Sequence, residues 1–389
     1  MSDLNLELQE ELASLCPLLQ TKLANRGFDP EHLLRLSIPL RKSFCAGRSG
    51  MRDRMQRNCI QGQLRVPQEG DIHIAHLFSG REKRSFQDVG LTAIARGELA
   101  LCVMAGGMAT RMSGVVKALL PVFNNETFLS LRLRENQKWS GDMGLPVPLW
   151  IMTSETTDQP VRGALKAIRA PAHVDVFVQD LSLRLTSEGI LFRDRHGMPS
   201  IYPTGHGDLV DALRRSSLLS GFLARGGKYV WIVNLDNLGA LIDPMILGFF
   251  MARGTDALVE VVEKRAGDHG GIPLYVDDRL RIVEECRLPC HFPVDEVSVF
   301  NTNTFLVRAE ALQKTDFLWD WLEIEKQVDG RPVIQFERLL QELTTVLPTT
   351  YLHVPRTGIE SRFLPIKDQT SLDRQRAEIE VVIGSRGIL

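Results

Sequence analysis

The sequence predicts an α/β fold, a mainly parallel mixed β-sheet flanked by helices. Short apolar runs rich in β-branched residues alternate with longer segments of helical spacing, which is typical of parallel sheets. Polar residues also gather directly after several apolar runs, where such sheets bind ligands. We expect strands over 99–104, 147–153, 174–179, 229–235, 257–263 and 299–307, and helices near 127–139, 159–169, 208–225 and 243–253.

The 389 residues divide into three predicted parts. Residues 1–98 form a helical N-terminal region, in which leucines recur at helical spacing and Asp29 is placed to cap a helix. Residues 99–325 form the α/β domain. Residues 326–389 form a short C-terminal region, in which we expect a helix over 332–346 and a strand near 350–354.

Composition excludes several classes of protein. Charged residues make up 24% of the chain and the formal net charge is −2, so nothing in the charge balance favours nucleic acid or an anionic membrane as a partner. No window approaches ~18 uninterrupted apolar residues, and the acidic, amphipathic N-terminus does not resemble a signal peptide. The six cysteines are scattered, which fits a reducing compartment. We therefore expect a cytoplasmic protein.

The segment LCVMAGGMATRMSGVVKALLP, residues 101–121, is the first candidate binding element. An apolar strand breaks at Gly106-Gly107, and Arg111 and Lys117 follow. Such a loop can bring bare backbone N–H groups and cations close to phosphates. It matches neither a P-loop nor GxGxxG, and a Gly-Gly pair after a strand also serves as a plain turn.

Polar residues lie at the ends of two further expected strands and just before an expected helix. Asp236 comes just after strand 229–235, where its carboxylate either holds a divalent cation beside phosphates or caps the next turn. His206 lies between two glycines in PTGHGD and either donates a hydrogen bond to a ligand or is an ordinary loop histidine. Gln179 either reads a base edge or caps a turn.

Two later segments carry polar candidates. Asn301 and Asn303 lie in strand 299–307, and because asparagine is unfavourable in strands the pair suggests a polar pocket wall. Lys367 follows an apolar segment and is either a phosphate ligand or a surface residue. Cys286, Cys290 and His291 make only a weak case for zinc, since a second ligand pair is missing.

Taken together, eight segments in colinear order over residues 99–370 resemble the UTP–glucose-1-phosphate uridylyltransferase (UDP-glucose pyrophosphorylase) family. Each segment is short, but their shared order and spacing make the resemblance specific. It implies a Rossmann-like, GT-A-like nucleotidyltransferase fold. The segments are MAGGMATRM–VVKALLPV, VFVQ, PTGHGD, VNLDNLGA, EKRAGDHGG–LRIVE, VFNTNTFLV, DGRPVIQFE and SRFLPIKD.

The resemblance also implies a reaction. UTP and glucose 1-phosphate would give UDP-glucose and pyrophosphate with Mg²⁺, as the sugar phosphate oxygen attacks the α-phosphorus in line. Such chemistry relies on positioning and on cations that offset negative charge. Two alternatives stay open: another sugar 1-phosphate (galactose or N-acetylglucosamine), or a catalytically weak relative that binds UTP or a UDP-sugar.

By this resemblance the nucleotide would bind at several strand ends. Gln179 and Gly205 would contact the uracil edge. Asn234 and Asp236 would lie at the ribose and the metal, with Asp236 as the Mg²⁺ ligand. The backbone of the glycine loop would hold uracil and ribose at Met104, Ala105, Gly106 and Gly107.

The resemblance assigns other residues to the phosphates and the sugar. Lys117 and Lys367 would bind phosphates, with Lys367 bridging the α-phosphate in the transition state. Arg111 would meet the pyrophosphate, and His206 the sugar phosphate. The hexose pocket would be lined by Gly271, Glu284, Asn301 and Asn303.

The chain departs from the family pattern in the glycine loop. Ala105 replaces the usual asparagine, Ala109 a usual glycine and Val116 the usual proline before Lys117. These changes motivate the alternative of a weak catalyst. The 21 residues after Asp368 are too few for the β-helix domain that makes oligomer contacts in eukaryotic members, so the resemblance predicts no oligomeric state.

Overall fold

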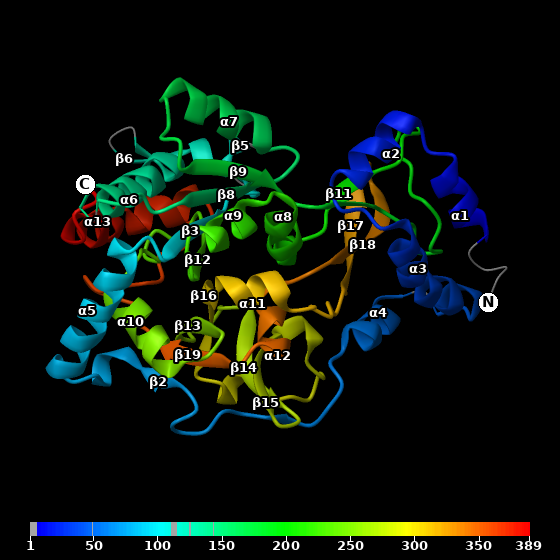
Figure 1. Cartoon of the computed structure of the whole chain (residues 1–389). Helices are drawn as coiled ribbons and strands as arrows, with labels where there is room; N and C mark the ends of the chain where they lie inside the picture. Colours follow the sequence, from blue (N-terminus) through cyan, green and yellow to red (C-terminus); the bar gives the residue numbers. More distant parts are fainter. Residues whose placement is uncertain (1–5, 49, 110–114, 124–125, 143) are drawn as a thin grey trace.

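The computed structural model describes residues 6–48, 50–109, 115–123, 126–142 and 144–389. An eight-stranded sheet crosses the centre of the molecule (Figure 1). β16 runs antiparallel to both of its neighbours, and all other neighbouring strands pair in parallel. The mainly parallel mixed sheet is thereby confirmed. The strand order is β2 (His73–Ile74), β19 (Thr349–His353), β13 (Ala257–Glu263), β16 (Val299–Arg308), β12 (Tyr229–Asn234), β3 (Leu99–Met104), β8 (Leu149–Thr153) and β9 (Val174–Val178).

Helices cover both faces of this sheet. Along β3, Leu101 and Val103 join one buried cluster, whereas Ala100 and Cys102 join another, because successive side chains point to opposite faces. Burial on both faces explains why the strand is a continuous apolar run. The first face packs on α5 (Gly80–Ala95), α6 (Phe128–Asp142), α7 (Asp158–Ala167), α10 (Pro244–Arg253) and α13 (Gln369–Ser385), and the second on α8 (Leu209–Arg215), α9 (Leu218–Ala224), α11 (Ala309–Lys314) and α12 (Leu343–Val346).

The N-terminal helices form a smaller unit beside the sheet (Figure 1). The Asp29 side chain caps α3 by accepting from the peptide N–H of His32 at 3.1 Å, as the sequence predicts. Leucines from this region pack with Leu183 of β10 and Phe336 of β18 in a third cluster. The unit comprises α1 (Leu6–Ala13), α2 (Pro17–Ala24), α3 (Pro30–Cys45), β10 (Leu181–Leu183), β11 (Ile201–Pro203), β17 (Leu322–Val328) and β18 (Arg331–Glu337), with α4 (Met51–Asn58) alongside.

The helix expected over 332–346 is wrong. Residues 331–337 instead form β18, which pairs with β17 across a two-residue turn. Asp329 and Gly330 both have positive φ, 52° and 73°, which is the geometry of a type I′ hairpin turn. An Asp-Gly pair between two segments of alternating apolar and polar residues is typical of such a hairpin. The apolar residues after Gly330 also recur at helical spacing, and the expected helix rests on that spacing. Helical structure begins only with the short 3-10 helix Leu340–Glu342 and continues into α12.

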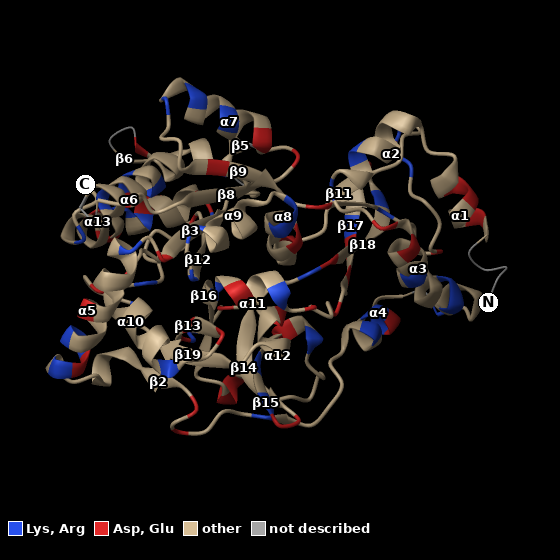
Figure 2. Cartoon of the chain, viewed as in Figure 1, with Lys and Arg blue, Asp and Glu red and all other residues tan. Residues whose placement is uncertain are grey.

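Segments on either side of the α/β domain contribute strands to its sheets. β2 pairs with β19 at one edge of the central sheet, and β1 (Leu64–Arg65) pairs with β14 (Gly271–Val276). β14 in turn pairs with β15 (Arg279–Glu284) in an antiparallel hairpin. Figure 2 shows acidic and basic residues mixed along the helices. None of the helices in the described part of the chain has the length and apolar character needed to cross a membrane.

Candidate active site

The carboxyl ends of β3 and β12 meet at one edge of the sheet. Met104 and Asn234 are paired as the last residues of these strands. After β3, the peptide N–H of Ala105 still donates to Met152 at 2.7 Å, so the backbone leaves the sheet only at Gly106. The chain then forms β4 (Met108–Ala109) and β5 (Val115–Val116). Arg111 lies outside the described residues.

Gln179 connects the glycine loop with the PTGHGD segment. Its side-chain nitrogen donates to the carbonyl oxygen of Gly205 at 3.3 Å. A Cβ on Gly106 would lie 2.4 Å from Oε1 of Gln179, so a side chain there would displace the amide of Gln179. Gly205 has a φ of 102° and lies against the backbone carbonyl of Arg338, and both features exclude a side chain. Three residues predicted at the uracil are therefore neighbours.

Lys117 and Asp236 form an ion pair at this edge. Nζ of Lys117 lies 2.5 Å from Oδ2 of Asp236, and the two side chains retain exposed fractions of 14% and 25%. Lys117 opens the short helix Lys117–Leu119 after β5. The cation and the carboxylate, predicted from separate segments, are thus in direct contact and still open to a ligand.

A bulge in β16 turns Asn303 toward the end of β12. The register with β13 shifts after Glu260, and Asn303 adopts a φ of 59°. Its side-chain nitrogen donates to Oδ1 of Asn234 at 3.1 Å, and its backbone N–H donates to Oδ1 of Asn301 at 2.9 Å. Bulges re-aim side chains in this way. Asn301 and Asn303 of β16 are therefore linked by hydrogen bonds to Asn234, the residue predicted to bind the ribose.

Asn237 attaches the loop that carries Lys367 to the end of β12. Its buried side chain donates to the carbonyl of Arg362 at 3.1 Å and accepts from the N–H of Leu364 at 2.8 Å. Next to it, the N–H of Ile366 donates to the carbonyl of Asp236 at 3.1 Å. Lys367 follows directly and is exposed. The backbone of the loop thus places Lys367 beside the strand end that bears Asp236.

His206 is held in its neutral form. The N–H of Leu340 donates to Nδ1 at 2.9 Å, which leaves Nε2 to carry the ring proton. Burial lowers the pKa of His206 to about 4. The ring is therefore a hydrogen-bond donor without a charge at neutral pH.

The residues predicted at the hexose come together across the β14–β15 hairpin and β16. Gly271 pairs with Glu284, and a Cβ on Gly271 would lie 3.4 Å from Oε1 of Glu284 and 3.7 Å from Cβ of Asn301. Burial raises the pKa of Glu284. Gln341, which is also buried, donates to Oε1 of Glu284. Sequence reasoning missed Gln341, because its partner Glu284 lies 57 positions away in the chain.

Arg338 is a second residue that sequence reasoning missed. Its buried guanidinium lies 2.8 Å from carboxylate oxygens of both Asp180 and Asp208. Its carbonyl accepts from the N–H of Gly207 at 3.0 Å. The arginine therefore fixes the PTGHGD turn from behind. No local motif marks it, since its partners come from elsewhere in the chain.

The residues at this edge fit a magnesium ion bound together with phosphates. Within the described ranges, no group of three or more His, Cys, Asp or Glu is placed to hold a metal by itself. Mg²⁺ commonly binds through one or two carboxylates and substrate phosphates. Asp236 supplies one carboxylate, half-buried beside a lysine that can move to a phosphate.

The family described as UTP–glucose-1-phosphate uridylyltransferase matches residues 52–377 of this chain, which include every site residue named above. The chain belongs to this family. The match agrees with the resemblance seen in the eight sequence segments. It extends that resemblance toward the N-terminus, since the segments begin only at residue 99.

Relatives of known sequence support this membership. The UTP–glucose-1-phosphate uridylyltransferase of Solanum tuberosum is 29% identical over 292 residues, which cover 71% of this chain and 60% of the relative. The corresponding protein of Encephalitozoon cuniculi is 29% identical over 288 residues, 71% of this chain and 57% of the relative. The chain thus spans about three fifths of the length of these members of the family.

Solved structures show the same fold. The UDP-glucose phosphorylase of Trypanosoma brucei superimposes with a TM-score of 0.71 at 23% identity, covering 92% of this chain and 77% of the other. The uridine diphosphate N-acetylglucosamine pyrophosphorylase of the same organism gives a TM-score of 0.75 at 16% identity, with 96% and 81% covered. At these identities the likeness concerns the fold of the uridylyltransferase family and leaves the sugar open.

Proposed function

We propose that this chain transfers a uridylyl group from UTP to glucose 1-phosphate, forming UDP-glucose and pyrophosphate. The observation that carries the proposal is the contact between Lys117 and Asp236 beside the loop of Lys367. This arrangement supplies two cations and one carboxylate at the strand edge. Phosphoryl transfer needs such a set, because its catalysis rests on positioning and on offsetting negative charge.

Each group has a role in this proposal. Gln179 and Gly205 bind the uracil edge, and Asn234, fixed by Asn303, binds the ribose. Lys117 leaves Asp236 for a phosphate when UTP enters. Asp236 would hold Mg²⁺, and the ion would offset the negative charge of the phosphates.

The acceptor approaches from the side of His206. The Nε2–H of His206 donates to the phosphate of the sugar 1-phosphate, because Nδ1 is occupied by the N–H of Leu340. One oxygen of that phosphate attacks the α-phosphorus in line, and pyrophosphate leaves opposite. Lys367 offsets the charge that grows on the α-phosphate. Glu284 and Asn301 bind the hexose.

A pyrophosphate-release assay tests the proposal. The enzyme is given UTP, Mg²⁺ and, in separate reactions, the 1-phosphates of glucose, galactose and N-acetylglucosamine. We expect the highest kcat/KM with glucose 1-phosphate. If pyrophosphate is released only with N-acetylglucosamine 1-phosphate or galactose 1-phosphate, the assignment of glucose as the sugar is wrong. No release with any sugar, together with measurable UTP binding, would favour the weak-catalyst alternative that Ala105, Ala109 and Val116 suggest.

A further inference from the structure

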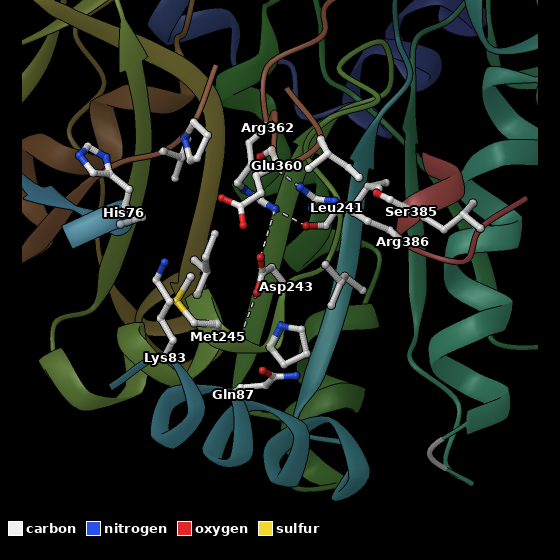
Figure 3. Close-up of a pocket in the computed structure, with 18 of the residues that line it drawn as sticks. His76, Lys83, Gln87, Leu241, Asp243, Met245, Glu360, Arg362, Ser385 and Arg386 are labelled. Carbon is white, nitrogen blue, oxygen red and sulfur yellow. Dashed lines mark hydrogen bonds and ion pairs between the residues drawn. The ribbon is translucent and has the colours of Figure 1, made fainter. Parts of the chain in front are cut away.

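A cavity of about 500 Å³ shares no residue with the candidate active site (Figure 3). It lies where α5, the start of α10 and the end of α13 come together. Its volume is in the range of small-molecule sites. One part of its wall is apolar, formed by Trp139, Leu241, Ile242, Met245, Ile246 and Ile388.

Arg362 brings an unused hydrogen-bond donor to this cavity. The residue is only 2% exposed. Nε and Nη2 each lie 2.7 Å from an oxygen of Glu260, and Nη2 also donates to the carbonyl of Leu241 at 2.9 Å. Nη1 makes no hydrogen bond to any described residue. Its ion-pair partner there, Oδ2 of Asp243, lies 3.8 Å away. A buried donor of this kind favours a ligand oxygen.

Three further cations line the cavity without an acidic ion-pair partner among the described residues: Lys83, Lys138 and Arg386. Lys83 extends from α5 into the cavity and makes no described ion pair (Figure 3). Arg386 donates to the carbonyls of Glu360 and Ser361 at 3.3 and 3.4 Å. Burial and the nearby charge of Arg362 lower the pKa of Arg386, whereas Asp243, Glu260 and Glu135 act in the opposite direction.

The acidic residues of the lining offset this charge only in part. Asp243 is engaged in capping α10, since it accepts from the N–H of Met245 at 2.9 Å. Glu360 is exposed at the rim. An anionic group would therefore gain both a buried donor and an excess of positive charge here, and an apolar group would gain the wall beside Trp139.

We propose that this cavity binds a small organic anion that carries a carboxylate or phosphate group on an apolar body. The anionic group contacts Nη1 of Arg362 and the ammonium of Lys83. The apolar body packs against Trp139 and Met245.

The same arginine connects the cavity to the candidate active site. The carbonyl of Arg362 accepts from Asn237, the N–H of Leu364 donates back to Asn237, and the N–H of Ile366 donates to the carbonyl of Asp236. A ligand held by Arg362 therefore steadies the segment that carries Lys367. Binding of the anion does not depend on the proposed function. A regulatory effect on turnover does rest on the proposed uridylyl transfer.

Isothermal titration calorimetry with three probes tests the site on the full chain. 3-Phenylpropionate and phenyl phosphate carry the anion, and 3-phenylpropanol is the neutral match. We expect both anions to bind at least about fivefold more tightly than the alcohol. Lys83→Gln should lower the affinity for both anions about threefold to fivefold, which is the scale of one half-exposed ion pair. Lys326→Gln, at an exposed lysine of β17, is the matched control and should leave binding unchanged.

A second variant at an exposed position separates a loss of binding from a loss of folding. Ile359 lines the cavity and is 56% exposed, so Ile359→Glu adds negative charge without opening the core. Ile359→Glu should lower the affinity for both anions and leave the affinity for 3-phenylpropanol unchanged. Equal binding of anions and alcohol, or unchanged anion binding in both Lys83→Gln and Ile359→Glu, would overturn the site.

Amide hydrogen exchange tests the connection without any catalytic step. Bound phenyl phosphate should slow exchange at Leu364 and Ile366, whose N–H groups hold the segment to β12. Unchanged exchange at both amides in the saturated protein would refute the connection. Failure of the uridylyl-transfer proposal would appear only in the pyrophosphate assay, so the two outcomes are distinguishable.

Discussion

Nζ of Lys117 lies 2.5 Å from Oδ2 of Asp236, across 119 positions of sequence. The lysine follows the glycine loop after β3, and the aspartate follows the neighbouring strand β12. In the absence of phosphate, Asp236 forms the ion pair with Lys117. This contact keeps both groups at the site, where Lys117 can bind a phosphate and Asp236 can bind a metal ion.

Asp236→Asn should lower kcat/KM by roughly 100-fold or more, because the amide holds a divalent cation poorly and offsets no charge on Lys117. The Mg²⁺ concentration for half-maximal activity should rise at the same time. A magnesium titration of the pyrophosphate assay measures both effects. Asp316→Asn, at an exposed aspartate, is the control. An unchanged magnesium requirement in Asp236→Asn would remove Asp236 as the ligand.

Lys367→Ala should reduce kcat by at least ~100-fold, the scale of one lost electrostatic contact in the transition state. UTP binding, measured by calorimetry, should change far less, because the proposed contact with the α-phosphate strengthens as the reaction proceeds. Lys326→Ala is the matched exposed lysine. Near-normal turnover in Lys367→Ala would take this residue out of the catalytic set.

Gln179→Ala should weaken the preference for UTP more than it slows the reaction of UTP. The amide is the group placed to read the base edge, and it makes no contact with Lys117 or Asp236. Gly106→Ala should give the same result, since the added methyl group displaces Oε1 of Gln179. Competition among the four nucleoside triphosphates measures the preference. Equal selectivity in both variants and the parent protein would contradict the assignment.

Gln341→Met should raise the KM for the sugar 1-phosphate several-fold and leave the KM for UTP unchanged. The variant keeps the volume of the side chain but removes the donor that holds Oε1 of Glu284. The two KM values from one set of assays provide an internal control. A parallel rise in both would instead indicate a general structural role for Gln341.

His206 should make stability depend on pH between about 6.5 and 4. The folded protein holds the ring neutral, with a pKa of about 4, whereas an unfolded histidine titrates near 6.5. As the pH falls through this interval the unfolded chain binds the proton first, so this contribution to the free energy of unfolding is lost. The stability advantage of the parent protein over His206→Asn should therefore shrink from pH 7 to pH 4.5 in urea unfolding. A constant difference would show that the pKa of His206 is the same in the folded and the unfolded protein.

Local patterns predicted the strands well because buried parallel strands must be continuous apolar runs. β3 and β12 follow the expected ranges closely. The helix expected over 332–346 is instead β18 at its start, since the apolar residues after the Asp-Gly turn also satisfy helical spacing. The turn residues, and not the periodicity, carried the correct information.

By itself, the sequence determined the α/β class, the glycine loop and the polar residues at the strand ends, because these depend on periodicity and on residues adjacent in the chain. Only the tertiary structure decided which of those residues touch. It joined Lys117 to Asp236, Asn303 to Asn234 and Gln341 to Glu284. Among the described residues, it also leaves Nη1 of Arg362 without a hydrogen bond, beside a cavity away from the candidate active site. Such contacts arise from strand order and packing between distant segments, which no local pattern encodes.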